Sequence, residues 1–146
     1  MDILRLALKS FLLIALLATI HITAINIGFY QGKVWIDIPL HIIGGYMLGL
    51  IWIWILDFRT LRKKIVPDFF IISVTFIGWV LLFSYFWEYF EFLVREYSPE
   101  LASTWKLYPP NLSDSLSDLA FGLLGGLIAL VYARLTRYRK LKDSKI

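Results

Sequence analysis

Apolar residues run through the chain in four long blocks that are separated by short polar connections. The blocks cover about residues 10–29, 38–56, 69–92 and 114–136. A helix needs about 20 apolar residues to cross roughly 30 Å of hydrocarbon, which is close to the length of each block. The pattern predicts an all-α integral membrane protein, a four-helix bundle in which residues 1–146 form a single transmembrane domain.

The first block raises the question of a signal peptide, because Arg5 and Lys9 precede it. Secretory signal peptides also begin with a basic segment followed by an apolar run. This run is long for a signal peptide, and no A-x-A cleavage site follows it. We therefore expect an uncleaved first helix.

The composition is typical of a membrane protein and excludes several kinds of functional site. Hydrophobic residues make up 59% of the chain, well above the share in an ordinary soluble domain. The chain has no cysteine, which excludes thiol catalysis, disulfides and cysteine metal sites. Any chemistry must come from the helices and their connections.

Basic residues are distributed unequally between the two sides of the predicted bundle. One side has twelve: Arg5, Lys9, Arg59, Arg62, Lys63, Lys64, Arg134, Arg137, Arg139, Lys140, Lys142 and Lys145. The other side has three: Lys33, Arg95 and Lys106. The positive-inside rule then places both termini of this multi-pass protein in the cytoplasm. Juxtamembrane anchoring explains the net charge of +4, so we expect no nucleic-acid partner.

Aromatic residues gather near the predicted outer ends of the helices, as an interfacial belt does. They are Tyr30, Trp35, Tyr85, Trp87, Tyr89, Tyr97, Trp105 and Tyr108. Trp52 and Trp54 are predicted at the inner interface.

Ionisable residues collect at the predicted outer face on three of the helices. They form three pairs, Asp37 with His41, Glu88 with Glu91, and Asp114 with Asp118. Spacings of three or four residues place both members of a pair on one helix face. Charged groups beside a membrane span are energetically expensive, so this convergence suggests a functional site.

Carboxylates that share a low-dielectric site need protons, basic side chains or a cation to offset their repulsion. We expect a divalent metal ion, because oxygen ligands with one imidazole suit magnesium, manganese, zinc or iron. The candidate ligands are His41, Glu88, Asp118 and Asp37, and the candidate catalytic groups are Glu91 and Asp114.

Glycines predict which helices meet. Gly45 and Gly49 form a small-residue face on the second helix, with Gly44 beside them, and Gly122 and Gly126 form another on the fourth, with Gly125 beside them. His41 precedes Gly45 by one turn, and Asp118 precedes Gly122 by one turn. Contact between these faces therefore predicts that His41 and Asp118 lie together.

Each candidate also has a purely structural interpretation. Asp37 and Asp114 would suit the positive ends of helix dipoles, and Glu91 could form an ion pair with Arg95. His21 is interpreted as a hydrogen-bonding residue of the first helix. Ser113, Ser115 and Ser117 are interpreted as helix-start residues.

The motifs Asp37-x-x-x-His41-x-x-Gly44, Trp87-Glu88-x-x-Glu91 and Asp114-x-x-x-Asp118 occur in that order. In this respect the chain resembles the uncharacterised bacterial inner-membrane family of the YjdF type, which is distantly similar to VanZ-like membrane proteins. The resemblance covers about residues 35–134. It implies that the six ionisable residues belong together, and it implies no particular reaction.

Three functions fit these patterns. The first is a metal-dependent membrane enzyme, a hydrolase or transferase that acts on a lipid, isoprenoid or cell-envelope headgroup at the outer leaflet. The second is a non-enzymatic assembly or regulatory subunit whose polar cluster is structural, with a membrane partner protein or a homo-oligomer as its context. The third is cation or proton transport, although no polar relay continues from the cluster toward Arg59.

Overall fold

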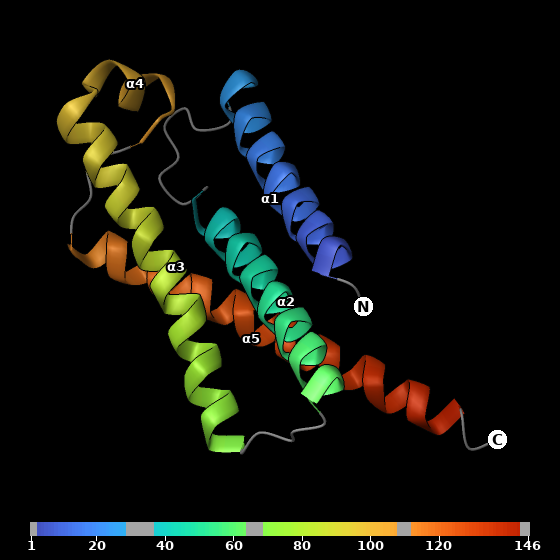
Figure 1. Ribbon diagram of the computed structural model, residues 1–146. Coiled ribbons are helices and arrows are strands. Elements are labelled where there is room, and N and C mark those ends of the chain that lie inside the picture. Colours follow the sequence, from blue (N-terminus) through green and yellow to red (C-terminus); the bar gives the residue numbers. More distant parts are fainter. Residues whose placement is uncertain (1–2, 29–36, 64–68, 108–111, 144–146) are drawn as a thin grey trace.

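The structure is a computed structural model that describes residues 3–28, 37–63, 69–107 and 112–143. Its long helices are α1 (Ile3–Asn26), α2 (Asp37–Lys63), α3 (Phe69–Tyr97) and α5 (Leu112–Asp143), and the short helix α4 (Pro99–Thr104) lies between α3 and α5 (Figure 1). Within these described ranges there is no strand. The predicted all-α bundle of four long apolar helices is confirmed.

Each long helix contains a segment that is long and apolar enough to cross a membrane. The four segments are Ala7–Asn26, Asp37–Leu56, Phe70–Tyr97 and Leu112–Leu135. The helices themselves extend beyond most of the predicted apolar blocks, because helical hydrogen bonding continues into the polar flanks. An exception is α1, which ends at Asn26 rather than near Phe29, a residue outside the described ranges. Gly28 follows with φ of 68°, a left-handed conformation that favours glycine and ends helices.

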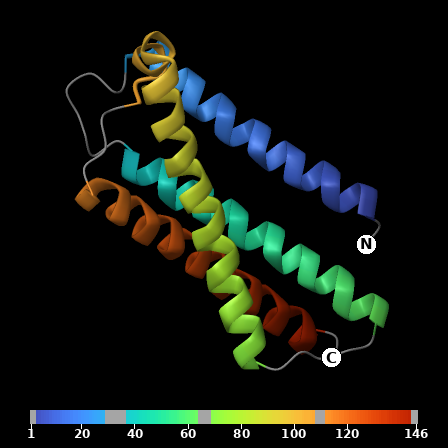
Figure 2. The ribbon, with the colours of Figure 1, turned by 60° about the vertical axis from the view of Figure 1, so that its left-hand side comes forward.

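The helices α2 and α5 pack together most closely, and both run in the same direction (Figure 2). Their backbones approach at glycines: a Cβ atom on Gly45 would overlap the Gly122 carbonyl group, and one on Gly125 would overlap the Ile42 carbonyl group. One turn further on, a Cβ on Gly49 would lie 2.8 Å from the Ala129 Cβ. The contact predicted from the two glycine faces is confirmed.

Helix α3 crosses the α2–α5 pair and completes the core (Figure 2). Phe76 and Val80 are almost fully buried against α5, near Gly126. The Trp52 and Phe76 rings meet edge to face with centroids 5.3 Å apart, and the Trp79 Nε1–H donates to the Leu48 carbonyl at 3.1 Å. Trp52 is only 8% exposed, because its ring packs in the core between α2 and α3. Its depth at the inner interface stays a prediction.

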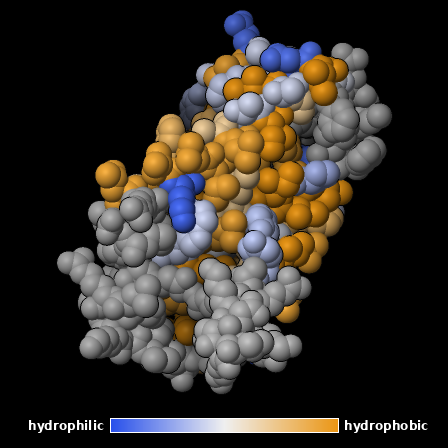
Figure 3. Space-filling view, turned by 90° about the vertical axis from the view of Figure 1, so that its right-hand side faces the viewer, coloured by the Kyte–Doolittle hydropathy of each residue, from blue (hydrophilic) through white to orange (hydrophobic). Residues whose placement is uncertain are grey.

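Helix α1 lies along the outside of α2 and runs in the opposite direction (Figures 1 and 2). Leu17 lies closest to Gly44, and the Lys9 ammonium group lies 5.3 Å from the centroid of the Trp54 ring. None of the described α1 side chains is buried. The space-filling view shows a broad apolar surface on this side of the molecule (Figure 3), as lipid contact requires.

The short helix α4 was not predicted, because its six residues lack a clear apolar period. Pro99 occupies its first turn, where a missing N–H is tolerated. Ala102 and Leu107 are buried, and the Trp105 and Phe90 rings lie 6.3 Å apart. These contacts hold the connection against the end of α3.

Candidate functional site

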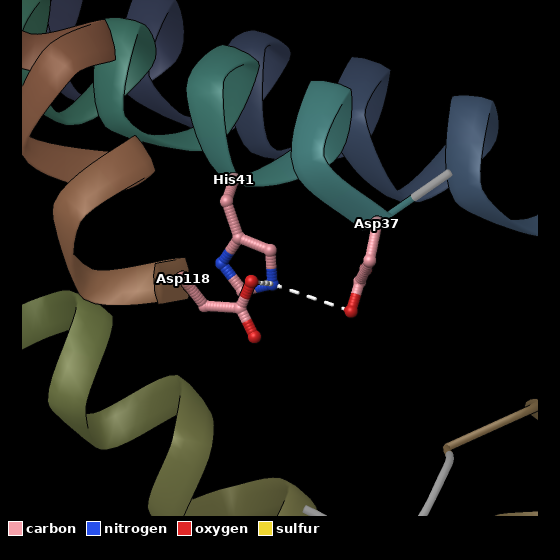
Figure 4. Close-up of side chains that lie close together, drawn as sticks. All are labelled: Asp37, His41 and Asp118. Atoms are coloured by element: carbon pink, nitrogen blue, oxygen red, sulfur yellow. Dashed lines mark ion pairs between the residues drawn. The ribbon is translucent and has the colours of Figure 1, made fainter. Parts of the chain in front are cut away.

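Two helices bring one histidine and two aspartates together at the beginning of the α2–α5 contact. Asp37 and His41 lie one turn apart on α2, and Asp118 faces them from α5 (Figure 4). The His41 Nε2 atom is 3.5 Å from Asp37 Oδ2 and 3.6 Å from Asp118 Oδ1. One ligand atom from each residue can be chosen so that all three lie within 4.8 Å of one another.

The glycine contact explains why these side chains meet. His41 lies one turn before Gly45, Asp118 lies one turn before Gly122, and the two glycines touch backbone to backbone. Because α2 and α5 are parallel, the residues one turn earlier on each helix also face each other. The predicted meeting of His41 and Asp118 is confirmed at 3.6 Å.

Burial differs among the three residues in a way that matters for access. The side chains of His41 and Asp118 are 9% and 8% exposed, whereas that of Asp37 is 40% exposed. Asp37 is also the first residue of α2, where the positive end of the helix dipole favours a carboxylate. The cluster therefore has a buried floor and one open side at the start of α2.

The distances at His41 Nε2 exceed those of direct charge-assisted hydrogen bonds, which are about 2.7–2.9 Å. They match the separation between two ligands of one metal ion more closely. A tetrahedral ion with ligand bonds of about 2.1 Å holds its ligand atoms about 3.4 Å apart. A single nitrogen that faces two carboxylate oxygens at this spacing has a geometry that a shared cation could bridge.

Glu88 was predicted as a ligand, but it lies outside this three-residue group. Its Oε2 atom accepts a hydrogen bond of 2.7 Å from the Ser115 hydroxyl group of α5. Its Oε1 atom is buried and has no hydrogen-bond partner among the described residues. Glu88 nevertheless interacts electrostatically with both His41 and Asp118, so it borders the group from α3.

Glu91, a predicted catalytic residue, forms an ion pair on its own helix. Its Oε2 atom accepts a hydrogen bond of 3.1 Å from Arg95 Nη1, four residues later. Both side chains are 13% exposed. The alternative pairing that the spacing suggested is therefore present, and Arg95 already occupies one of the Glu91 oxygens.

Asp114 and His21 flank the group without joining it. Asp114 lies in the first turn of α5 and interacts electrostatically with Asp118, one turn away. His21 projects from α1, with its ring 6.5 Å from the Trp87 ring and in edge-to-face orientation. It also interacts electrostatically with Asp37, so α1 brings a second imidazole toward the same end of the bundle.

The balance of charge among these residues favours a cation. Asp37, Glu88, Glu91, Asp114 and Asp118 contribute five carboxylates, and Arg95 is the guanidinium paired with one of them. The positive ends of the α2 and α5 helix dipoles also lie here, and each is equivalent to about half a positive charge. Carboxylates this close together cannot all stay ionised unless protons or a cation offset their repulsion, and a divalent ion would do so.

Ser115 is the residue whose contribution the sequence interpretation missed. It was assigned to the helix start, where it does lie, but its hydroxyl group also crosses to Glu88 on α3. The available signal was its position three residues before Asp118, which places both side chains on nearly the same face of α5. Ser117 instead bonds its own helix, at the Ser113 carbonyl.

Comparison with curated proteins and with solved structures gives no match. Residues 3–139 match the family described as "Predicted membrane protein (DUF2238)". This range includes all of the predicted site residues, and the description agrees with the four apolar helices of a multi-pass membrane protein. Because the match covers nearly the whole chain, the chain belongs to the DUF2238 family of predicted membrane proteins.

Proposed function

We propose that Asp37, His41 and Asp118 bind a divalent metal ion, and that the protein is a metal-dependent membrane enzyme. The observation that carries this proposal is the convergence of three potential ligand atoms from two helices within 4.8 Å. Two of the three residues are more than nine-tenths buried, so the group is held by the closest packing in the molecule rather than by mobile surface chains.

The ligand set supports a catalytic rather than a structural metal site. Structural zinc sites usually close their coordination with four protein ligands, whereas catalytic sites keep a position open for water or substrate. Asp37, His41 and Asp118 supply three ligands. One imidazole and two carboxylates suit zinc, manganese, iron or magnesium.

Such an ion would act as a Lewis acid and lower the pKa of a bound water toward about 7. Hydrolysis or group transfer at a polar headgroup is therefore the reaction class that we propose, with a lipid or cell-envelope headgroup as substrate. Asp114, next to Asp118, remains the candidate general base. Glu91 is a weaker candidate, because Arg95 holds one of its oxygens.

We further propose that the site lies at the outer face of a bacterial inner membrane and that both termini are cytoplasmic. The unequal distribution of lysine and arginine supports this orientation. The order of the three motifs supports the closer relationship to YjdF-type proteins.

Metal content is the direct test. Protein purified in detergent without chelators should contain about one equivalent of a divalent metal by mass spectrometry, or take it up when Zn²⁺ or Mn²⁺ is added. Asp118→Asn and His41→Ala should lower the affinity by at least about tenfold, since each removes a ligand. Glu96→Gln, a matched loss of one carboxylate at an exposed position of α3, should leave the affinity unchanged.

The same experiment separates the proposal from a purely structural polar cluster. Wild-type protein that takes up no divalent metal would overturn the proposal and favour the structural role. Metal uptake should also enable turnover: proteoliposomes loaded with metal should release a headgroup product from a lipid extract, detected by mass spectrometry. The Asp118→Asn protein should release none.

A further inference from the structure

Ser115 and Glu88 form a hydrogen-bonded side-chain contact between α3 and α5 next to the metal site. The Ser115 hydroxyl donates to Glu88 Oε2 at 2.7 Å, and both residues are partly buried. This bond fixes one carboxylate oxygen and thereby determines where the other oxygen points.

The second oxygen, Glu88 Oε1, is buried and has no hydrogen-bond partner among the described residues. A buried carboxylate oxygen without a partner has lost its hydration and gained no hydrogen bond in exchange, which is unfavourable. Native proteins rarely retain such a group unless a water, an ion or a chemical role accounts for it. This oxygen therefore points to a partner that the described residues do not supply.

The packing of α3 on α5 directs Glu88 toward the group formed by Asp37, His41 and Asp118. Ser84, one turn earlier on α3, lies against Gly122, because a Cβ on that glycine would be 2.7 Å from the Ser84 Oγ. The helices α3 and α5 run in opposite directions, so Glu88 faces the residues that precede Gly122, which include Ser115 and Asp118. Its electrostatic interactions with Asp118 and with His41 agree with this placement.

We propose that Glu88, positioned by Ser115, is the outer partner of the metal site and that its Oε1 atom accepts a hydrogen bond from a water bound to the ion. This inference rests on the proposed metal site and adds α3 to it. A contact through water fits the position of Glu88 outside the three-residue group. Outer partners of this kind orient the site, and their loss typically lowers metal affinity by about 10–100-fold.

Mn²⁺ is the probe, because electron paramagnetic resonance measures the free ion directly. Glu88→Gln should weaken Mn²⁺ binding by about tenfold or more, since it removes the charge that holds the water. Ser115→Ala should weaken binding severalfold, and Ser115→Thr should restore it, because threonine retains the hydroxyl donor. Glu96→Gln, which removes a carboxylate from an exposed position of the same helix, should bind as wild type does.

The outcomes separate the two proposals. If wild-type protein binds no Mn²⁺, Zn²⁺ or Mg²⁺, the metal site and this inference both fail. If it binds Mn²⁺ and Glu88→Gln binds equally well, only the inference fails, and a lower melting temperature of the metal-free variant would assign Glu88 a structural role. If Glu88→Gln does not fold, the comparison of Ser115→Ala with Ser115→Thr decides, and equal binding by these two variants would overturn the positioning by Ser115.

Discussion

Individual carboxylates in this protein occupy two kinds of environment. Glu91 is held by a cation on its own helix, at a spacing of four residues that any α-helix supplies. Asp118 instead faces an imidazole across a helix–helix contact and depends on that contact for its partner. The first environment is local, and the second is tertiary. We therefore expect substitutions in the two environments to change different properties.

Removal of the Arg95 guanidinium should mainly affect stability. Arg95→Leu leaves the Glu91 carboxylate, which is 13% exposed, without its cation, and should lower the free energy of unfolding by about 3 kcal/mol. The double variant Glu91→Gln, Arg95→Leu should recover much of this loss, because no buried charge then remains unpaired. Chemical denaturation in mixed micelles measures both values. Equal stability of Arg95→Leu and wild type would mean that water reaches Glu91.

At the scale of helices, the contact between α2 and α5 both packs the bundle and brings the candidate site residues together. Glycines at the crossing allow backbone to touch backbone, which aligns the preceding turns of the two helices. The site residues lie on those turns. A side chain added at the crossing must therefore separate the helices and also separate His41 from Asp118.

Two glycine substitutions test this coupling. Gly45→Ala places a methyl group against the Gly122 backbone, which cannot rotate away, and should destabilise the protein by about 2 kcal/mol or more. It should also abolish metal binding. Gly78→Ala is the matched control, because its Cβ meets nothing within 4 Å, and it should leave stability unchanged or raise it by up to about 1 kcal/mol. Thermal melts with and without Mn²⁺ measure both effects, and normal metal binding by Gly45→Ala would contradict the coupling.

At the scale of the whole molecule, four membrane segments put the start of α1 and the end of α5 at the same end of the bundle. The starts of α2 and α5, which carry Asp37, His41 and Asp118, lie with α4 toward the opposite end (Figure 1). Helix α1 packs mainly on α2, with the His21 ring also meeting the Trp87 ring of α3, and most of its apolar side chains are exposed and left for lipid. The bundle is thus a close set of three helices with a fourth beside it.

Orientation in the membrane can be measured directly, because the chain has no native cysteine. Ser103 is an exposed residue of α4, at the same end of the bundle as Asp37, His41 and Asp118, and is replaced in the variant Ser103→Cys. Lys145 belongs to the basic tail and is replaced in Lys145→Cys. In right-side-out vesicles an impermeant maleimide should label the first variant and should label the second only after permeabilisation. The reverse pattern would place the proposed metal site on the cytoplasmic side.

Hydropathy and residue spacing were enough to predict the helices and the pairs of ionisable residues on them. Hydrophobic length identifies a membrane helix, and spacings of three or four residues place side chains on one face, so both are local properties. The positions of the glycines on the two helices also predicted that His41 and Asp118 meet, because helices approach closely where small residues face each other. Pairing of Glu91 with Arg95 was likewise accessible as a local alternative.

Which of the six ionisable residues lie close together depends on how the helices pack. Asp37 joins His41 and Asp118, whereas Glu88 bonds to Ser115 and remains outside. The choice depends on how far α3 crosses α5 and on how each side chain rotates, and neither quantity is encoded in spacing along one helix. The burial of Trp52 was decided in the same way, because hydropathy gives the depth of a residue in the membrane and not the neighbour that its side chain faces.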